Sequence, residues 1–483
     1  MSATVLIRKE PVYQQLAGLL ETMIRSRSLR AGDRVPSVRH FSRQQRVSVP
    51  TALQAYATLE MRGLIAARPK SGFFVRAQQA DFVREPNHAA SLPKVTDLAG
   101  LDPLDSMLSD HSNPRLVPLG AAVPSGELLP AEKLARAMGA IARKLGSRSI
   151  AYDMAPGSEI LRREIARRSL EYGCSLKPDE LIITIGGTEA LALALRATCE
   201  PGDTVAIESP TYYGLVDMLR ELHLQALPIR MDGARGMDLD ALESSLRRTR
   251  VAACVLIPNF NNPTGSLMPD ENKRRLLEIL APRKIPVIED DIYGDLQHEG
   301  ARPRCVKTFD REGSVLLCSS FSKTLAPGYR IGYIAAGSRH DRVLRLKKTS
   351  TLAGATLPAL AVADFLKNGG YDRYLRSLRQ KYRHQVARMR EAIVETFPGD
   401  IGLSRPQGGF VLWCELPVKV NSVELFRQAR AADISIAPGP LFSAQGGHQN
   451  YIRLNCGHPW SAQIERSIGI LGHLVKRLQG RPS

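Results

Sequence analysis

Hydrophobic positions near the N-terminus recur at the three- and four-residue spacing of an amphipathic helix. The pattern begins at Tyr13 and stops before Gly32, a residue type that favours a helix end. A second short helix follows, and a third is predicted to start at Ser48, whose hydroxyl can cap its first turn. Two short apolar runs within 64–76 then predict a pair of strands. Three helices and a hairpin together predict a winged helix-turn-helix domain over residues 1–76.

Beyond about residue 116, helix-patterned segments alternate with short apolar runs. Five of these runs are 181–185, 204–207, 251–257, 287–288 and 315–317. Apolar runs separated by helices predict a buried, mostly parallel sheet, and therefore an α/β domain over residues 116–483. Such sheets bind ligands beyond the carboxyl ends of their strands, so we expect the chemistry to follow each run directly.

Residues 77–115 differ from both flanking regions. They contain four prolines and show little periodicity. Because prolines interrupt helices and central strands, this stretch is predicted to be a linker rather than a packed element, with a short helix over about 101–108. The chain is therefore expected to consist of a small domain, a linker and a large domain.

Length and cysteine usage narrow the class of protein. A domain usually holds roughly 100–200 residues, so 483 residues of which 43% are hydrophobic allow more than one domain with a substantial core. No run of about 18 apolar residues and no N-terminal secretory signal occur, which argues against a membrane span. The seven cysteines lie far apart without a C-x-x-C pair, so we expect a cytoplasmic protein with no metal site.

Positive charge is concentrated in the predicted small domain. The whole chain carries a formal net charge of +18, and residues 1–76 hold 13 Lys and Arg against 4 Asp and Glu. Such an excess in a short segment favours a surface for a polyanion such as nucleic acid. A solvated face without a partner is the alternative on charge alone.

Polar residues follow the first three apolar runs of the large domain. Gly187 and Thr188 begin a helix, where backbone N–H groups attract an anion, although many strand–helix turns carry two glycines. Tyr212 follows the second run and could stack on an aromatic cofactor or belong to the core. Asn262 follows the third run within Asn-Pro-Thr-Gly, a turn sequence, and its amide can donate to a phenolate oxygen.

The fourth and fifth runs are followed by charged residues. A carboxylate beside a buried strand, such as Asp290, needs a cation, which could be a protonated pyridine nitrogen or an arginine. Lys323 has Ser322 on one side and Arg330 seven residues further on. Lysine forms imines with aldehydes, and serine and arginine suit a phosphate dianion. An exposed loop lysine would leave that spacing unexplained.

The N-terminal motifs resemble the GntR family of DNA-binding domains. They are Leu29-x-x-Gly32-x-x-x-Pro36-Ser37-x-Arg39, Val47-Ser48, Ala55-Tyr56-x-x-Leu59-x-x-x-Gly63-Leu64-Ile65 and Ser71-Gly72-x-Phe74-Val75. The resemblance implies that the third helix enters the major groove of double-stranded promoter DNA and that the hairpin approaches the minor groove. The positions expected to contact DNA are Arg39, Ser48, Thr51, Arg68, Lys70, Ser71 and Gly72. The family often has an arginine near the start of the third helix, where this chain has Val49-Pro50, so fewer hydrogen bonds to base edges are expected there.

The ordered set of residues after the five apolar runs resembles the fold-type I, class I aminotransferases. This resemblance covers most of residues 116–460 and implies pyridoxal 5′-phosphate as the cofactor, with Lys323 as the catalytic residue that forms the internal aldimine. It also implies that Asp290 pairs with the pyridine nitrogen. The phenolic oxygen is assigned to Asn262 and Tyr293, and the ring face to Tyr212. The phosphate is assigned to Gly187, Thr188, Ser320, Ser322 and Arg330.

Two further positions follow from the same resemblance. Tyr152, in Tyr152-x-x-x-x-Gly157, matches a tyrosine that reaches the phosphate of the neighbouring subunit, which implies a homodimer. Arg453, in Tyr451-Ile452-Arg453-Leu454-Asn455, matches the arginine that holds a substrate carboxylate through two hydrogen bonds.

A GntR-like domain joined by a linker to an aminotransferase-like domain resembles the MocR (GabR-like) subfamily of transcription regulators. The resemblance implies a regulator that senses a small amine, an amino acid or pyridoxal phosphate itself through Lys323. The main alternative is an active aminotransferase that carries a DNA-binding domain, which sustained turnover would reveal. A third interpretation is a non-specific DNA-binding protein with a decayed large domain, but such decay should have removed Lys323 or Asp290.

Overall fold

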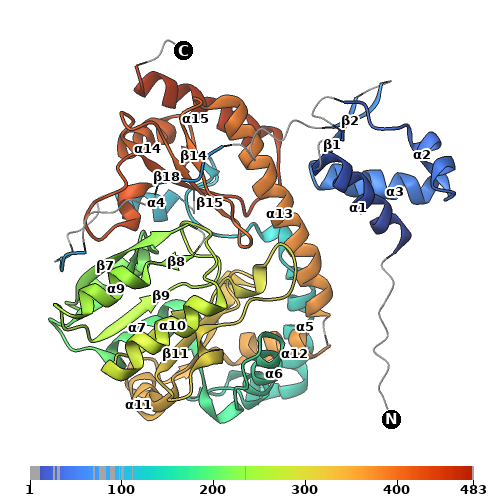
Figure 1. Cartoon of the computed structure of the whole chain (residues 1–483). Coiled ribbons are helices and arrows are strands. Elements are labelled where there is room, and N and C mark those ends of the chain that lie inside the picture. The colour runs from blue at the N-terminus through green and yellow to red at the C-terminus, as the bar shows by residue number, and fades with distance from the viewer. Residues whose placement is uncertain are drawn as a thin grey trace. The chain divides into compact units, whose positions relative to one another are not determined.

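The computed structural model describes eleven stretches of the chain, which are 11–25, 28–29, 33–68, 71–75, 83–87, 93–96, 98, 103–110, 113–233, 235–368 and 370–480. These residues form two compact units, of which the first holds the described residues up to Val83 together with Ala387–Glu395 and the second holds the rest. Figure 1 colours the chain from blue at the N-terminus to red at the C-terminus, so the N-terminal part of the small unit is blue.

The small unit is a three-helix domain with a hairpin. Its elements are α1 (Val12–Arg25), α2 (Val38–Gln44), α3 (Val49–Met61), β1 (Ile65–Arg68) and β2 (Gly72–Val75), with β1 and β2 antiparallel. Ser37 and Ser48 cap α2 and α3, because each side chain accepts a hydrogen bond from a backbone N–H of the first turn. The predicted winged helix-turn-helix is confirmed.

Tyr56 of α3 joins the helices to the hairpin. Its side chain is fully buried, and its ring lies edge-on to Phe41 at 5.7 Å and to Phe73 at 5.2 Å between centroids. Its hydroxyl donates a 2.5 Å hydrogen bond to the carbonyl of Pro36, so the one polar atom of the ring is satisfied. The hairpin is therefore packed on the same core as α2 and α3.

The large unit is built on an eight-stranded sheet in the order β5-β12-β11-β10-β9-β6-β7-β8. The strands are β5 (Leu181–Ile185), β6 (Thr204–Ser209), β7 (Gln225–Asp232), β8 (Gly236–Met237), β9 (Ala253–Leu256), β10 (Val287–Asp290), β11 (Val315–Ser320) and β12 (Ile331–Ala335). The pairs from β11 across to β7 are parallel, whereas β12 is antiparallel to both of its neighbours. The predicted mostly parallel sheet is confirmed.

All five apolar runs named in the sequence lie on this sheet, as β5, β6, β9, β10 and β11. Strand β12 also belongs to the sheet and separates β5 from β11. It fits there because Gly332 has no side chain: a Cβ at this position would lie 2.6 Å from the backbone of Gly186. This close approach brings the start of α7, which follows β5, beside the end of β11.

Helices surround the sheet and the C-terminal part of the unit (Figure 1). They are α5 (Ala131–Leu145), α6 (Glu159–Ser169), α7 (Gly186–Thr198), α8 (Tyr213–Glu221), α9 (Leu239–Leu246), α10 (Asp270–Leu280), α11 (His340–Ser350), α12 (Thr356–Asn368), α13 (Tyr371–Thr396), α14 (Ser422–Ala431) and α15 (Ala462–Leu478). Two short pairings, β4 (Asp153–Met154) with β13 (Ala353–Gly354) and β3 (Val117–Pro118) with β16 (Ile434–Ser435), join segments that are distant in the sequence.

A second, antiparallel sheet lies near the C-terminus. Its strands, in spatial order, are β14 (Gly402–Leu403), β15 (Val411–Glu415), β18 (Tyr451–Asn455) and β17 (Ala437–Pro438). Strand β18 carries Arg453, which stands opposite Trp413 of β15. This sheet therefore fixes the position of the arginine that was predicted to bind a carboxylate.

The described part of the predicted linker is packed against the large unit, which differs from the expectation of an unpacked stretch. Arg84 forms a 2.5 Å ion pair with Glu415, and the hydroxyl of Tyr451 donates to the carbonyl of Asn87 at 2.5 Å. Further along, α4 (Pro103–Asp110) buries Met107 completely. The partners of these contacts lie more than 300 residues away in the sequence, so local pattern could not reveal them.

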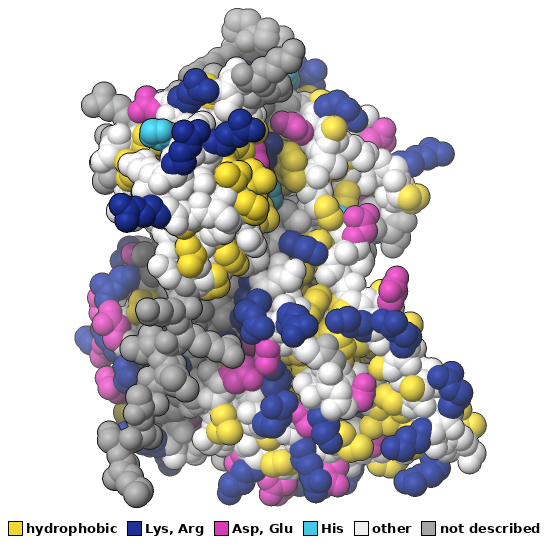
Figure 2. Space-filling view, turned by 90° about the vertical axis from the view of Figure 1, so that its right-hand side faces the viewer, with side chains coloured by type: hydrophobic (Ala, Val, Ile, Leu, Met, Phe, Trp, Pro, Cys, Tyr) yellow, Lys and Arg dark blue, Asp and Glu magenta, His cyan; other side chains and the backbone are white. Residues whose placement is uncertain are grey.

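Surface and cysteine chemistry complete the fold. Hydrophobic side chains are visible in separate groups among Lys and Arg side chains on the face shown in Figure 2. Within the described residues, no helix has both the length and the hydropathy to cross a bilayer. All seven cysteines are buried and none forms a disulfide, and the described residues contain no cluster of metal-binding side chains.

Candidate functional site

One cavity at the carboxyl ends of the central strands brings together residues that the sequence predicted separately. Nine of the predicted residues line it: Gly187, Thr188, Tyr212, Asn262, Asp290, Tyr293, Ser322, Lys323 and Arg330. They follow β5, β6, β9, β10 and β11 in the chain. Because parallel strands end at the same edge of a sheet, residues from five separate segments meet there.

Lys323 follows β11 and is partly buried. Its Nζ donates a 2.6 Å hydrogen bond to the carbonyl of Ala122, and no carboxylate of the described residues forms an ion pair with it. Burial and the nearby cations Arg453 and Arg330 together lower the pKa of Lys323 to about 8, although Asp290 opposes them. A lysine in this environment has a larger neutral, nucleophilic fraction near pH 7 than an exposed one.

Asp290 is the last residue of β10 and is buried. Burial, together with the neighbouring carboxylate of Asp291, raises its pKa to about 7. Asp291 has a cation of its own, because Arg302 lies 2.5 Å from it. Across the described residues, no arginine or lysine lies within ion-pair distance of Asp290. The site therefore has a buried carboxylate that an additional cation would stabilise as the charged form.

An anion cradle lies at the start of α7. Arg330 Nη1 donates to the hydroxyl of Ser322 at 3.4 Å, and the backbone N–H of Ser322 donates to the hydroxyl of Ser320 at 2.9 Å. Gly186 has φ +76°, and a Cβ there would lie 2.7 Å from Arg330 Cζ, so glycine is required for the arginine to reach this place. A helix N-terminus, hydroxyls and a guanidinium form a suitable site for a phosphate.

Arg453 is completely buried at the side of the same region. Its Nη1 donates to the side-chain oxygen of Asn262 at 3.2 Å, and its Nη2 donates to the carbonyl of Gly120. Its Nε is buried without a hydrogen-bond partner, and the described residues place no carboxylate in an ion pair with it. Burial lowers the pKa of Arg453. A ligand carboxylate would supply the missing counter-charge.

Several residues of the site carried no signal in the sequence. Ala122 and Gly120 contribute only backbone carbonyls, and Phe442 lies 5.2 Å from the Arg453 guanidinium through its ring. Backbone contacts leave no residue-type pattern, and an aromatic ring in a buried segment is ordinarily predicted as core. Conversely, Tyr152 lies outside the cavity, with 79% of its surface exposed.

The predicted DNA-binding positions lie on the small unit. Arg39 is exposed on α2, whereas the hydroxyls of Ser48 and Thr51 share a 2.7 Å hydrogen bond at the start of α3. Ser71 and Gly72 are exposed at the turn of the hairpin, where Gly72 has φ +97°. Lys70 and the side chain of Arg68 lie outside the described residues.

Two basic residues near Arg39 were not predicted as DNA contacts. Arg43 lies one turn further along α2, Arg46 lies in the turn that follows, and both are exposed. Helical spacing from Arg39 could have indicated Arg43, because residues four apart share a helix face.

Both units match known protein families. Residues 12–75 match the family of bacterial regulatory proteins described as gntR, and residues 115–470 match the family described as aminotransferase class I and II. The "Uncharacterized HTH-type transcriptional regulator YjiR" of Escherichia coli is 38% identical over 465 residues, covering 96% of this chain and 99% of that protein. The chain is a MocR-like member of the GntR family. It is therefore a regulator with a DNA-binding domain and a pyridoxal phosphate-dependent, aminotransferase-like domain.

The large unit of this MocR-like regulator, taken without the DNA-binding domain, is similar to aminotransferases. The "2-aminoadipate transaminase" of Thermus thermophilus is 32% identical over 376 residues, covering 77% of this chain and 93% of that protein. The crystal structure of LysN, an alpha-aminoadipate aminotransferase from Thermus thermophilus, superposes with a TM-score of 0.73 at 30% identity and covers 77% of this chain and 95% of that one. That structure contains N-(5′-phosphopyridoxyl)-L-leucine.

Proposed function

We propose that this MocR-like regulator changes its affinity for operator DNA when an amine that carries a carboxylate binds in the large unit. The observation that carries the proposal is the buried Arg453, which lacks a counter-charge among the described residues and lowers the pKa of Lys323. A carboxylate on the ligand would neutralise the arginine while its amino group meets the cofactor. Pyridoxal phosphate itself is the alternative signal, because the cofactor site alone could respond to its supply.

The residues of the cavity fit the cofactor. Lys323 would hold it covalently, and Asp290 would pair with its pyridine nitrogen, a match supported by the buried carboxylate that lacks a cation. Asn262 and Tyr293 would hydrogen-bond its phenolic oxygen. Tyr212 would stack on its ring. Its phosphate would be bound by Gly187, Thr188, Ser320, Ser322 and Arg330. When bound, the cofactor supplies an aldehyde carbon that reacts reversibly with amines.

A structural route connects the effector site to the linker within the large unit. Arg453 and Tyr451 lie on the same face of β18, two residues apart, and Tyr451 stacks on Trp413 with 5.3 Å between centroids. The hydroxyl of Tyr451 holds the linker through the carbonyl of Asn87. We expect a ligand that moves Arg453 to change how tightly the linker is held. A coupling of about 1–3 kcal/mol, roughly 5–150-fold in affinity, would alter operator occupancy.

The decisive experiment measures operator binding during titration with a panel of amino acids. Purified protein loaded with pyridoxal phosphate is mixed with a labelled promoter fragment and then with each amine. At least one carboxylate-bearing amine should change both the absorbance of the cofactor and the affinity for DNA. An operator affinity that stays the same with every amine and with or without the cofactor would contradict the sensor proposal.

A true aminotransferase is the second candidate function. It is supported by the nine predicted residues that line the cavity and by the similarity to transaminases. Sustained conversion of an amino donor and a keto acid would favour it, whereas a regulator should change its spectrum without accumulating product.

Replacing Arg453 by glutamine tests the assignment of the effector carboxylate. We expect the affinity for the active amino acid to fall by roughly 10- to 100-fold, because a charge-assisted hydrogen bond contributes about 1.5–3 kcal/mol. The affinity for the corresponding amine without a carboxylate should stay the same. Equal decreases for both ligands would indicate a structural role for Arg453 instead. The spectral titration measures both affinities.

Replacing Arg39 by alanine tests the assignment of the small unit. The operator affinity should fall, and the slope of log affinity against log salt concentration should become shallower by about 0.9 for each phosphate that the variant no longer neutralises. Fluorescence anisotropy at several salt concentrations provides the measurement. An unchanged slope would place the phosphate contacts elsewhere, and Arg43 and Arg46 would be the next residues to vary.

We also propose a homodimer. Exposed apolar residues gather where β4 pairs with β13, namely Ile150 at 88%, Tyr152 at 79%, Met154 at 49% and Leu352 at 42% exposure. A second subunit would cover them and would place Tyr152 near the partner's phosphate site. Analytical ultracentrifugation should give twice the chain mass of 53.1 kDa, and Met154→Asp should shift the protein toward monomer.

A further inference from the structure

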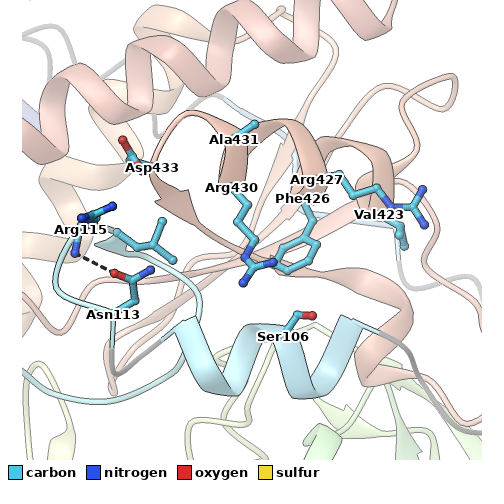
Figure 3. A pocket seen from close by; sticks show the side chains of 10 residues that line it. Ser106, Asn113, Arg115, Val423, Phe426, Arg427, Arg430, Ala431 and Asp433 are labelled. Carbon is cyan, nitrogen blue, oxygen red and sulfur yellow. Dashed lines mark hydrogen bonds between the residues drawn. The ribbon is translucent and has the colours of Figure 1, made fainter.

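A second cavity of about 700 Å³ lies between the linker helix α4 and α14 of the large unit (Figure 3). This volume falls in the range of about 300–1,000 Å³ that is typical of small-molecule sites. Ser106 of α4 stands on one side, and Arg430 projects from α14 on the other (Figure 3). None of the residues assigned to the cofactor or to its effector lines this cavity.

Half of the side chains that line the cavity are hydrogen-bond donors, and three of these are cations. Three arginines are present, Arg115, Arg427 and Arg430, against one carboxylate, Asp433. Arg430 uses its Nε to bind Asp110 at 2.9 Å, and its two Nη atoms make no hydrogen bond within the described residues. The side-chain oxygen of Asn113 accepts a hydrogen bond from the backbone N–H of Arg115. The side-chain NH₂ group of Asn113 therefore remains a donor.

The remaining wall is apolar. Phe426 contributes an aromatic ring to the lining, and Val423 and Leu116 add aliphatic surface. A guanidinium recognises a carboxylate through two parallel hydrogen bonds, and apolar walls select a ligand with a hydrocarbon body. A cationic ligand would meet like charge here. Arg427 and Arg430 already pair with Glu424 at 3.6 Å and Asp110 at 2.9 Å, so Arg115 is the lining arginine that lacks a carboxylate partner among the described residues.

We propose that this cavity binds a small organic carboxylate whose hydrocarbon part packs on Phe426, and that the bound molecule holds the linker helix α4 against α14. The ligand touches both helices at once, so it binds only while α4 is docked. Docking already has its own anchors, because Met107 and Asp110 of α4 are buried. At a ligand concentration of ten times its dissociation constant, the ratio of docked to undocked α4 would rise about elevenfold. The site is separate from Lys323, so this linkage does not depend on the cofactor.

Benzoate and its neutral analogue benzamide form a matched pair of probes. Calorimetric titration of the full-length protein loaded with cofactor should show benzoate binding at least tenfold more tightly than benzamide. Equal binding of the two probes, or no binding of benzoate at millimolar concentration, would overturn the carboxylate assignment.

Variants then locate the bound benzoate. The double variant Arg115→Gln/Arg427→Gln keeps the Arg430–Asp110 pair intact and should weaken benzoate binding at least tenfold. The control Arg466→Gln removes an exposed arginine of α15 outside the cavity and should leave binding unchanged. Binding should also persist in Arg453→Gln. If that variant alone abolishes it, benzoate occupies only the effector site and the proposal fails.

Hydrogen–deuterium exchange tests the effect on the linker helix. Saturating benzoate should slow the exchange of peptides that cover α4 by about the factor expected from linkage, roughly tenfold. Peptides from α10 on the main sheet should exchange at an unchanged rate. Tight binding without any slowing in α4 would refute the coupling to the linker.

Discussion

Replacing Lys323 by alanine should abolish the absorbance of the lysine-bound cofactor near the edge of the visible range. Lys323 is the one lysine that lines the cofactor cavity among the described residues, so no other amine there can take its place. The response of operator affinity to amines should disappear with it, while DNA binding by the small unit persists. Ultraviolet–visible spectroscopy of protein incubated with pyridoxal phosphate, followed by the promoter-binding titration, measures both effects.

The control for this variant is Lys348→Ala. Lys348 is exposed on α11 and does not line the cavity, so its removal should change neither the spectrum nor the response to amines. Circular dichroism should show the same helix content for both variants. Alanine at position 323 removes a partly buried amine that forms no ion pair within the described residues, so no carboxylate loses a partner. A Lys323→Ala protein with an unchanged spectrum would overturn the cofactor assignment.

Replacing Arg302 by methionine should lower the free energy of unfolding of the large unit by about 3–5 kcal/mol, the usual cost of removing one partner of a buried ion pair. Arg302 lies 2.5 Å from Asp291 and 2.6 Å from Asp295, and its guanidinium is 3.7 Å from the centroid of the Tyr172 ring. Without it, two carboxylates are left in a buried environment. Asp291 would then also repel the adjacent Asp290 more strongly, so weaker cofactor binding should accompany the decrease in stability.

Urea denaturation of the variant, compared with a surface pair, measures this effect. Arg275 pairs with Asp240 on the surface, where the two side chains are 45% and 82% exposed. Arg275→Met should therefore change stability by less than about 1 kcal/mol. If both variants lower the urea midpoint of the large unit by the same amount, the Arg302 network contributes no more to stability than a surface ion pair does.

Local sequence patterns predicted much of this fold because the responsible interactions are short-range. Ser48 caps α3 through a backbone N–H three residues away, and the apolar runs of the large domain are buried strands. Strand β12 was harder to predict, since its place between β5 and β11 depends on a glycine that allows two backbones to meet. The docked linker was predicted wrongly as an unpacked stretch, because Arg84 and Asn87 find Glu415 and Tyr451 only in the folded chain.

The sequence by itself determined that this protein has two domains of different chemistry, because strand periodicity, helix caps and the residues after each strand are local features. It also indicated which side chains could hold a cofactor. Only the tertiary structure decided that nine of them share one cavity, that Arg453 is buried beside them without a counter-charge, and that α4 closes a second cavity with α14. These features depend on distances between segments hundreds of residues apart, and burial and electrostatics follow from those distances.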